Sequence, residues 1–167
     1  SDSFPATLAI ATGGSPVSTG VYYDTTWDDR LSPPGSACAT RGALVAYKEN
    51  LNFTATGSTF ADINPATLPL DPDAGCTPVY PHQYLHVNTI YEVIHAAGLR
   101  TAVCDKHPSY EILSGPSGTG LDDFYGPEFN SAKKDIVKIT ANDELRVVAV
   151  LNQINGLDHT GTTHVGV

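Results

Sequence analysis

Ser3 is the hydroxyl of this chain that is best placed to act as a nucleophile. It stands directly before Phe4-Pro5 and an apolar stretch that predicts a helix over residues 4–12, ended by Gly13. A serine at a helix N-terminus accepts a backbone N–H and so caps the helix. A phosphorylated serine there would also meet free N–H groups and the positive end of the helix dipole. Position alone leaves both interpretations open.

A second group of polar side chains, Asp105-Lys106-His107, follows an apolar stretch that predicts a buried strand over residues 99–104. In open α/β sheets, ligands bind beyond the carboxyl ends of strands. A carboxylate, a cation and an imidazole gathered there could hold a phosphate or orient a leaving group. The alternative is a polar turn in which Pro108 breaks the strand and the aspartate pairs with a neighbouring cation.

Two stretches of the chain resemble a known family. The first is similar to the nucleophile segment of the nucleotide pyrophosphatase/phosphodiesterase branch of the alkaline phosphatase superfamily. The matching residues, at the family's spacing, are Ser3-Phe4-Pro5, Thr12-Gly13, Pro16 and Gly20. The second stretch, residues 78–123, resembles secreted bacterial and fungal type I phosphodiesterases. The resemblance implies an α/β fold with an alkaline-phosphatase-like sheet flanked by helices, of which residues 1–167 would form a single or partial domain.

The resemblance also implies a reaction and a set of site residues. The reaction would be metal-dependent hydrolysis of a phosphodiester or phosphomonoester, with two divalent ions, expected to be zinc, activating the serine. Ser3 would be the nucleophile and its oxygen a metal ligand, while Lys106 and His107 would shape the phosphate pocket. Asp24 falls where the family usually has an asparagine that contacts the phosphate. A carboxylate there would repel a phosphate unless it were protonated or bound to metal.

His159 is a weaker candidate metal ligand. The superfamily uses an aspartate followed four residues later by a histidine, and here Asn155 and His159 have that spacing. An amide is a poorer ligand than a carboxylate. The stretch before it, residues 143–154, also has helical rather than strand spacing, and Asn155-Gly156 would end that helix. The other interpretation of His159 is a solvated loop after the helix.

The superfamily's other metal ligands are not found in this sequence. Because a free hydroxyl is a weak nucleophile, we expect the chain to be a piece of a longer enzyme, with most metal ligands outside it. The absence of methionine likewise indicates a processed product or a fragment. Partners would be a small phosphate-ester substrate and a second fragment of the same precursor. The rival hypotheses are a catalytically inactive secreted binding or structural domain that keeps the fold, and an unrelated small disulfide-stapled glycoprotein.

Composition excludes several classes of function. Among 167 residues, 18 are acidic and 9 basic, giving a net charge of −9. This balance argues against a nucleic-acid-binding surface, although bound metal ions would reverse the local charge at a phosphate site. No apolar run approaches 18 residues, which argues against a membrane span.

The cysteines bear on cellular location. Cys38 and Cys76 lie in loop-like sequence and are expected to form a disulfide, which would leave Cys104 as a buried free thiol in the predicted strand. Three reduced thiols are the alternative. Asn52 begins an Asn-Phe-Thr glycosylation sequon. Together with the family's usual location, these features predict a secreted, extracellular glycoprotein.

The remaining elements are expected from local pattern. An apolar stripe predicts a helix over residues 87–97, ended by Gly98. Residues 21–27 are aromatic and β-like, and residues 43–47 could form a short strand or a helix. A helix followed by glycine and an apolar strand is a unit of an open α/β sheet.

Overall fold

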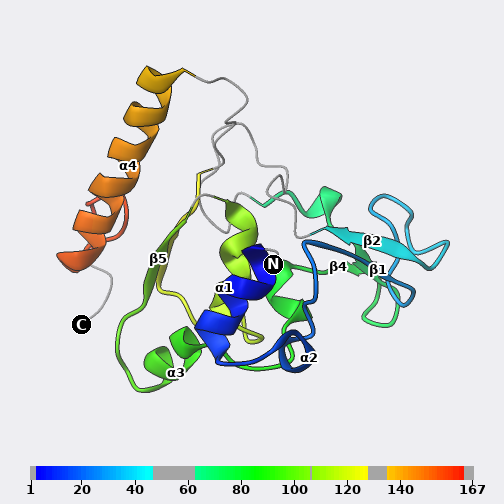
Figure 1. Cartoon of the computed structure of the whole chain (residues 1–167). Coiled ribbons are helices and arrows are strands. Elements are labelled where there is room, and N and C mark those ends of the chain that lie inside the picture. The colour runs from blue at the N-terminus through cyan, green and yellow to red at the C-terminus, as the bar shows by residue number, and fades with distance from the viewer. Residues whose placement is uncertain (1–2, 47–62, 106, 128–134, 164–167) are drawn as a thin grey trace.

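The structure is a computed structural model, and it describes residues 3–46, 63–105, 107–127 and 135–163. Figure 1 shows a mixed α/β molecule in which the described residues form three two-stranded sheets and several helices. In chain order the elements are α1 Ser3–Thr12, α2 Pro16–Thr19, β1 Thr25–Asp28, β2 Ala43–Ala46, η2 Pro65–Thr67, β3 Leu70–Asp71, β4 Thr77–Pro78, η3 Pro81–Tyr84, α3 Ile90–Ala96, β5 Ala102–Cys104, η4 Pro108–Ser114, β6 Asp123–Tyr125 and α4 Ile136–Ile154. The mixed α/β class is confirmed, but the described ranges contain no sheet of alkaline-phosphatase type.

Helix α1 is close to the predicted helix. Phe4, Leu8 and Ala11 recur at helical spacing and are buried. The helix ends where Gly13 takes a positive φ of 69°, a conformation that glycine adopts at little cost. The short α2 follows, starting at a proline and closing at Gly20 with φ 82°. This second turn reverses the chain toward the start of α1.

The two antiparallel sheets lie together at one side of the molecule (Figure 1). Strand β1 pairs with β2, and β3 with β4. A bridge between Ser32 and Leu70 links the loop after β1 to β3. Within the ambiguous stretch 43–47, residues 43–46 form a strand, because they pair with β1 from Thr25↔Ala46 to Asp28↔Ala43.

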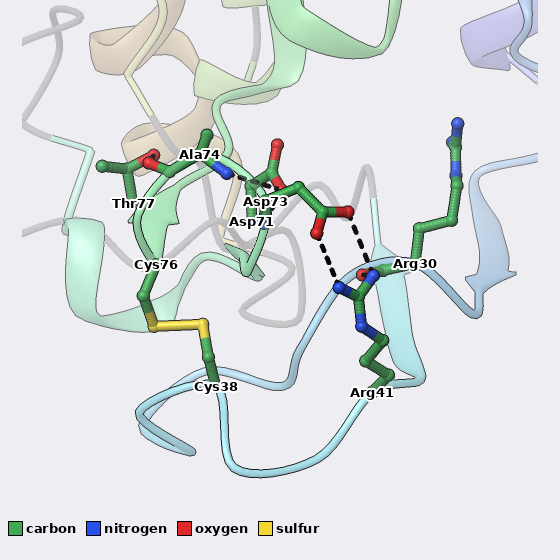
Figure 2. Close-up of a disulfide and its surroundings, with 8 residues drawn as sticks. All are labelled: Arg30, Cys38, Arg41, Asp71, Asp73, Ala74, Cys76 and Thr77. Atoms are coloured by element: carbon green, nitrogen blue, oxygen red, sulfur yellow. Dashed lines mark hydrogen bonds and ion pairs between the residues drawn. A yellow bond between two sulfur atoms is a disulfide. The ribbon is translucent and has the colours of Figure 1, made fainter.

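The predicted disulfide joins the loops of these two sheets (Figure 2). Cys38 and Cys76 are bonded, with 5.9 Å between their Cα atoms. Beside them Arg41 donates two hydrogen bonds to the carboxylate of Asp73, at 3.1 and 2.7 Å. Cys104 is the free thiol, as expected, and it is half-buried.

Strands β5 and β6 form a parallel pair, in register from Ala102↔Asp123 to Cys104↔Tyr125. The strand predicted over residues 99–104 is therefore real but shorter. Helix α3 also begins later than predicted, because Thr89 caps it: its hydroxyl accepts from Glu92 N at 3.3 Å and the Glu92 carboxylate accepts from Thr89 N at 3.3 Å.

Helix α4 is longer than the predicted 143–154. Its start is set by Asp135, whose carboxylate accepts from Val137 N at 3.1 Å. It ends at Asn155, as expected. In Figure 1 α4 stands at the edge of the molecule next to β5, far from β1 and β2.

One main core holds α1, β2, β5, β6 and η4 together. Its fully buried members include Phe4, Leu8, Val21, Val45, Ile112 and Leu113. Within the described ranges, no helix is both long enough and apolar enough to cross a membrane.

Candidate functional site at the start of helix α1

Asp24 lies at the N-terminus of α1, next to Ser3. One of its carboxylate oxygens accepts a hydrogen bond from the backbone N–H of Phe4, over 3.2 Å. Ser3 is the first residue of the helix and is exposed, whereas Asp24 is half-buried. The positive end of a helix dipole stabilises such a carboxylate. The structure therefore brings together the predicted nucleophile and the residue predicted to contact phosphate.

Packing of Phe4 fixes this helix end against the segment that follows β5. The Phe4 ring stacks on Tyr110 with 4.9 Å between ring centroids and an interplanar angle of 13°. On the same tyrosine lies His107, at 6.3 Å and 14°. His107 is buried and precedes η4 as its N-cap. The His107 imidazole and the Phe4 ring of α1 thus both pack on Tyr110, which links His107 to the helix that carries Ser3.

Lys106, the cation predicted to shape the phosphate pocket, lies outside the described residues, as does the sequon at Asn52. Asp105 continues β5 and donates its N–H to Tyr125 O at 2.9 Å, which extends the pairing with β6. Burial of the Tyr91 side chain and, to a smaller extent, the negative charge of Asp105 raise the pKa of Tyr91. The polar segment thus follows the carboxyl end of a parallel strand, as the sequence predicted.

The described residues do not fit the expected pair of zinc ions. Nowhere in the described ranges do three His, Cys, Asp or Glu side chains gather closely enough to hold a metal ion. Ser3 and Asp24 bring one hydroxyl and one carboxylate to the helix end, fewer ligands than a zinc site needs.

His159 is held in a buried pair that the sequence analysis missed. Its Nδ1 lies 2.8 Å from Asp123 Oδ1, and its backbone N–H donates to Asp123 Oδ2 at 2.8 Å. Gln153 donates to the same Oδ2 at 2.7 Å, and the Tyr125 ring stacks on the imidazole at 5.1 Å. The His159 side chain is only 15% exposed. It is therefore packed against β6 rather than solvated.

Asn155, the residue considered as a partner ligand for His159, has a different role. Its amide donates to Leu151 O at 2.9 Å and so satisfies a carbonyl at the end of α4. The helical spacing before Asn155 was the signal against a ligand pair, and that helix is confirmed. The partner of His159 is 36 residues away, a pairing for which the local sequence has no signal.

A second histidine–carboxylate pair joins η3 to η4. His82 Nδ1 contacts Glu111 Oε1, and the His82 backbone N–H donates to Glu111 Oε2 at 3.0 Å. Glu111 is almost fully buried, and Ser114 Oγ donates to its carbonyl at 2.7 Å. The ring of His82 also lies so close to Gly118 that a side chain there would clash. Sequence spacing did not single out this pair.

The free thiol Cys104 is unsuited to act as a nucleophile. Burial raises the pKa of Cys104, which favours the neutral thiol, and the thiol lies 3.9 Å from the carbonyl of Arg146. Its contacts are those of a packing residue between β5 and α4.

His95 makes a contact between two elements of the fold. It pairs with Asp122 at 3.2 Å, where α3 meets the segment before β6. Burial raises the pKa of Asp122, but hydrogen bonds from Thr101 and His95 outweigh it and hold that pKa below its usual value.

Comparisons with known proteins add no further assignment: no protein family, no curated protein and no solved structure matches the chain.

Proposed function

We propose that the start of α1 is the nucleophile site of a phosphate-ester hydrolase, with Ser3 as the attacking residue. The observation that carries the proposal is the contact between Phe4 N–H and the Asp24 carboxylate at 3.2 Å. The contact shows that a carboxylate oxygen of Asp24 accepts from the Phe4 N–H in the first turn of α1, next to the exposed Ser3. A phosphate oxygen has the same charge and hydrogen-bonding capacity, and helix N-termini bind such anions.

The reaction divides into two displacements at phosphorus. In the first, the Ser3 oxygen forms a bond to phosphorus, the bond to the leaving alcohol breaks, and that alcohol takes a proton. In the second, water attacks the phosphoserine and releases phosphate or a phosphomonoester, and Ser3 regains its proton. The Phe4 N–H, which donates to Asp24 in the structure, would stabilise the charge on a phosphoryl oxygen that displaces this carboxylate, since Pro5 has no N–H to offer.

Asp24 and His107 have supporting roles in this proposal. Asp24 is the carboxylate that accepts from this helix end, and in this proposal it takes the Ser3 proton. His107 stacks on Tyr110 in the same ring cluster and would help to shape the phosphate pocket. Two divalent ions, which the family resemblance implies, would need ligands from outside the described residues.

The test compares Ser3→Ala with Ser15→Ala in the full chain. Ser15 is a matched control because it precedes α2 as an exposed N-cap whose side chain makes no capping hydrogen bond. The assay measures release of 4-nitrophenol from 4-nitrophenyl phosphate and bis(4-nitrophenyl) phosphate, with and without added zinc. Mass spectrometry of acid-quenched protein locates any phosphoserine.

We expect phosphoserine at position 3 in the wild type and in Ser15→Ala, and neither label nor turnover in Ser3→Ala. Turnover that survives Ser3→Ala, or a phosphorylated residue elsewhere, would overturn the proposal. Absence of both turnover and label in the wild type, with zinc present, would favour a catalytically inactive binding or structural domain. The absence of a three-ligand metal cluster from the described ranges is the observation that favours this second candidate.

We also propose that the chain is extracellular. The disulfide between Cys38 and Cys76 supports this, since such bonds persist in oxidising compartments. Intact mass of the native protein, before and after reduction and alkylation, tests it. Recovery of two protected cysteines from the natural source supports the proposal, and three freely alkylated cysteines contradict it.

A further inference from the structure

Helix α4 turns a polar face toward the rest of the molecule. Its single buried residue is Ala149, and the structure describes every residue of this helix. Its hydrogen bonds to the rest of the molecule include those from Arg146, which donates to Pro127 O at 3.1 Å, and from Gln153, which donates to Asp123 at 2.7 Å. Val150 and Ile154 lie at the edge of a cleft beside β5. A surface helix of a globular protein normally packs its apolar stripe inward. In α4 most of the apolar side chains are instead exposed.

The outward side of α4 carries a regular seam, here called the outer seam. Its members are spaced by three, four, three, four and three residues: Val137, Thr140, Glu144, Val147, Leu151 and Ile154. All six are exposed, and the four apolar ones are exposed by between 53% and 74%. This alternation of three and four is the pattern by which one helix packs along another.

The outer seam is long enough for such packing. With 19 residues and a rise of 1.5 Å per residue, α4 is about 28 Å long. In Figure 1 the helix stands at the edge of the molecule, with no other element beyond it. Apolar side chains left exposed along one face of a helix indicate an interaction site in soluble proteins.

Glu144 at the centre of the outer seam indicates the kind of partner. It makes no ion pair with any described residue, whereas its neighbour Asp143 lies 3.5 Å from Arg146. The seam has two polar members, Thr140 and Glu144, of which only Glu144 is charged. A charged residue in a helical seam selects the partner and its register. A buried carboxylate needs a cation opposite it. The partner should therefore carry lysine or arginine at the facing position.

A second copy of this chain does not meet that requirement. Parallel pairing of two outer seams places Glu144 against Glu144, and antiparallel pairing places it against Val147. Either arrangement buries an unpaired carboxylate, which is strongly unfavourable. The net charge of −9 also disfavours self-association and favours a basic partner.

We propose that the outer seam binds an amphipathic helix of another polypeptide. That helix carries apolar residues at heptad spacing and a lysine or arginine that faces Glu144. The inference is independent of the proposed hydrolase function, because it uses no residue of the Ser3 site.

The test uses two synthetic helical peptides with leucine and isoleucine at heptad spacing. They differ only at the position that faces Glu144, which is lysine in one and glutamate in the other. Isothermal titration calorimetry measures their affinity for the full chain and for Glu144→Lys. We expect the wild type to prefer the lysine peptide by about tenfold or more, since like charges oppose one another at an interface. Glu144→Lys should reverse the preference.

A matched pair of leucine variants tests the position of the seam. Leu151 belongs to the outer seam and Leu145 does not, although both are exposed, by 53% and 58%. Leu151→Asp should weaken binding of the lysine peptide at least about tenfold, and Leu145→Asp should leave it unchanged. Circular dichroism confirms that both variants stay folded.

Three results would overturn the proposal. The first is equal binding of the two peptides, and the second is equal loss of binding in both leucine variants. The third is a concentration-dependent dimer in sedimentation that Leu151→Asp abolishes, because a second copy would then be the occupant.

Discussion

Removal of the Cys38–Cys76 bond should cost a large part of the stability of this chain. The bond closes a loop with a sequence separation of 38 residues. For a loop of this length, the chain-entropy relation gives about 13 cal/mol/K, or about 4 kcal/mol at 25 °C. Both cysteines have positive φ, 59° and 63°. Relaxation of that backbone would return roughly 1 kcal/mol at each residue, so the expected loss lies at about 2–4 kcal/mol.

The assay is urea unfolding of the double variant Cys38→Ser/Cys76→Ser, followed by circular dichroism and tryptophan fluorescence. Cys104→Ser is the matched control, because Cys104 is the free cysteine and forms no disulfide. Reduction of the wild type should reproduce the double variant, since both open the same loop. A loss below about 1 kcal/mol, or an equal loss in Cys104→Ser, would show that this loop does not constrain the unfolded chain as argued.

Three further outcomes are expected. Thr89→Ala should lose roughly 1–2 kcal/mol in urea unfolding, because the hydroxyl caps α3 and donates to Leu113 O at 3.0 Å; a loss within error would refute the capping argument. Asp24→Asn should bind inorganic phosphate at least about tenfold more tightly in calorimetry, because a like charge is removed at contact distance, and unchanged affinity would contradict a phosphate site there. The carboxylate of Asp158 accepts several hydrogen bonds within the loop of residues 158–163, and the largest effect comes from the Thr160 hydroxyl. These bonds hold the pKa of Asp158 well below its ordinary value. Its stabilising effect is thus present above the ordinary aspartate pKa and is lost as pH falls through the lower folded value. Amide exchange at Thr160 should accelerate on that acidic side in the wild type and show no such step in Asp158→Asn.

The spacing of apolar residues in the sequence predicted several elements of the fold correctly. Helix α1 follows from its apolar spacing and the glycine at its end, and the parallel strand β5 follows from a short apolar run. Where the prediction failed, a capping residue decided the boundary: Thr89 delays the start of α3, and Asp135 starts α4 earlier than its apolar pattern suggested. The Thr89–Glu92 capping box was legible in the sequence, as a threonine followed three residues later by a glutamate.

The candidate site was predictable to a different degree in each of its parts. Ser3 was singled out by its position before a predicted helix and by the family resemblance, and Asp24 by that resemblance alone. They meet because α2 and its closing Gly20 reverse the chain over a short distance. The pairs His159–Asp123 and His82–Glu111 bridge 36 and 29 residues. Residues so far apart in the sequence are not related by the period of a helix or a strand, so only the folded structure identifies the two pairs.

The same limit applies to α4, with an instructive difference. Its apolar periodicity was visible in the sequence, and the ordinary inference is that such a stripe packs on the chain's own sheet. In the folded chain α4 instead meets β6 and the segment after it through other residues. Gln153 donates to Asp123, Arg146 donates to Pro127 O, and Ala149 is buried. Periodicity therefore established that α4 has an apolar face, but not which surface that face meets. The stripe visible in the sequence, formed by Leu145, Val148, Leu151 and Ile154, is exposed throughout. The proposed outer seam runs partly beside it and includes Glu144, an unpaired carboxylate of a kind that is not tolerated in a core.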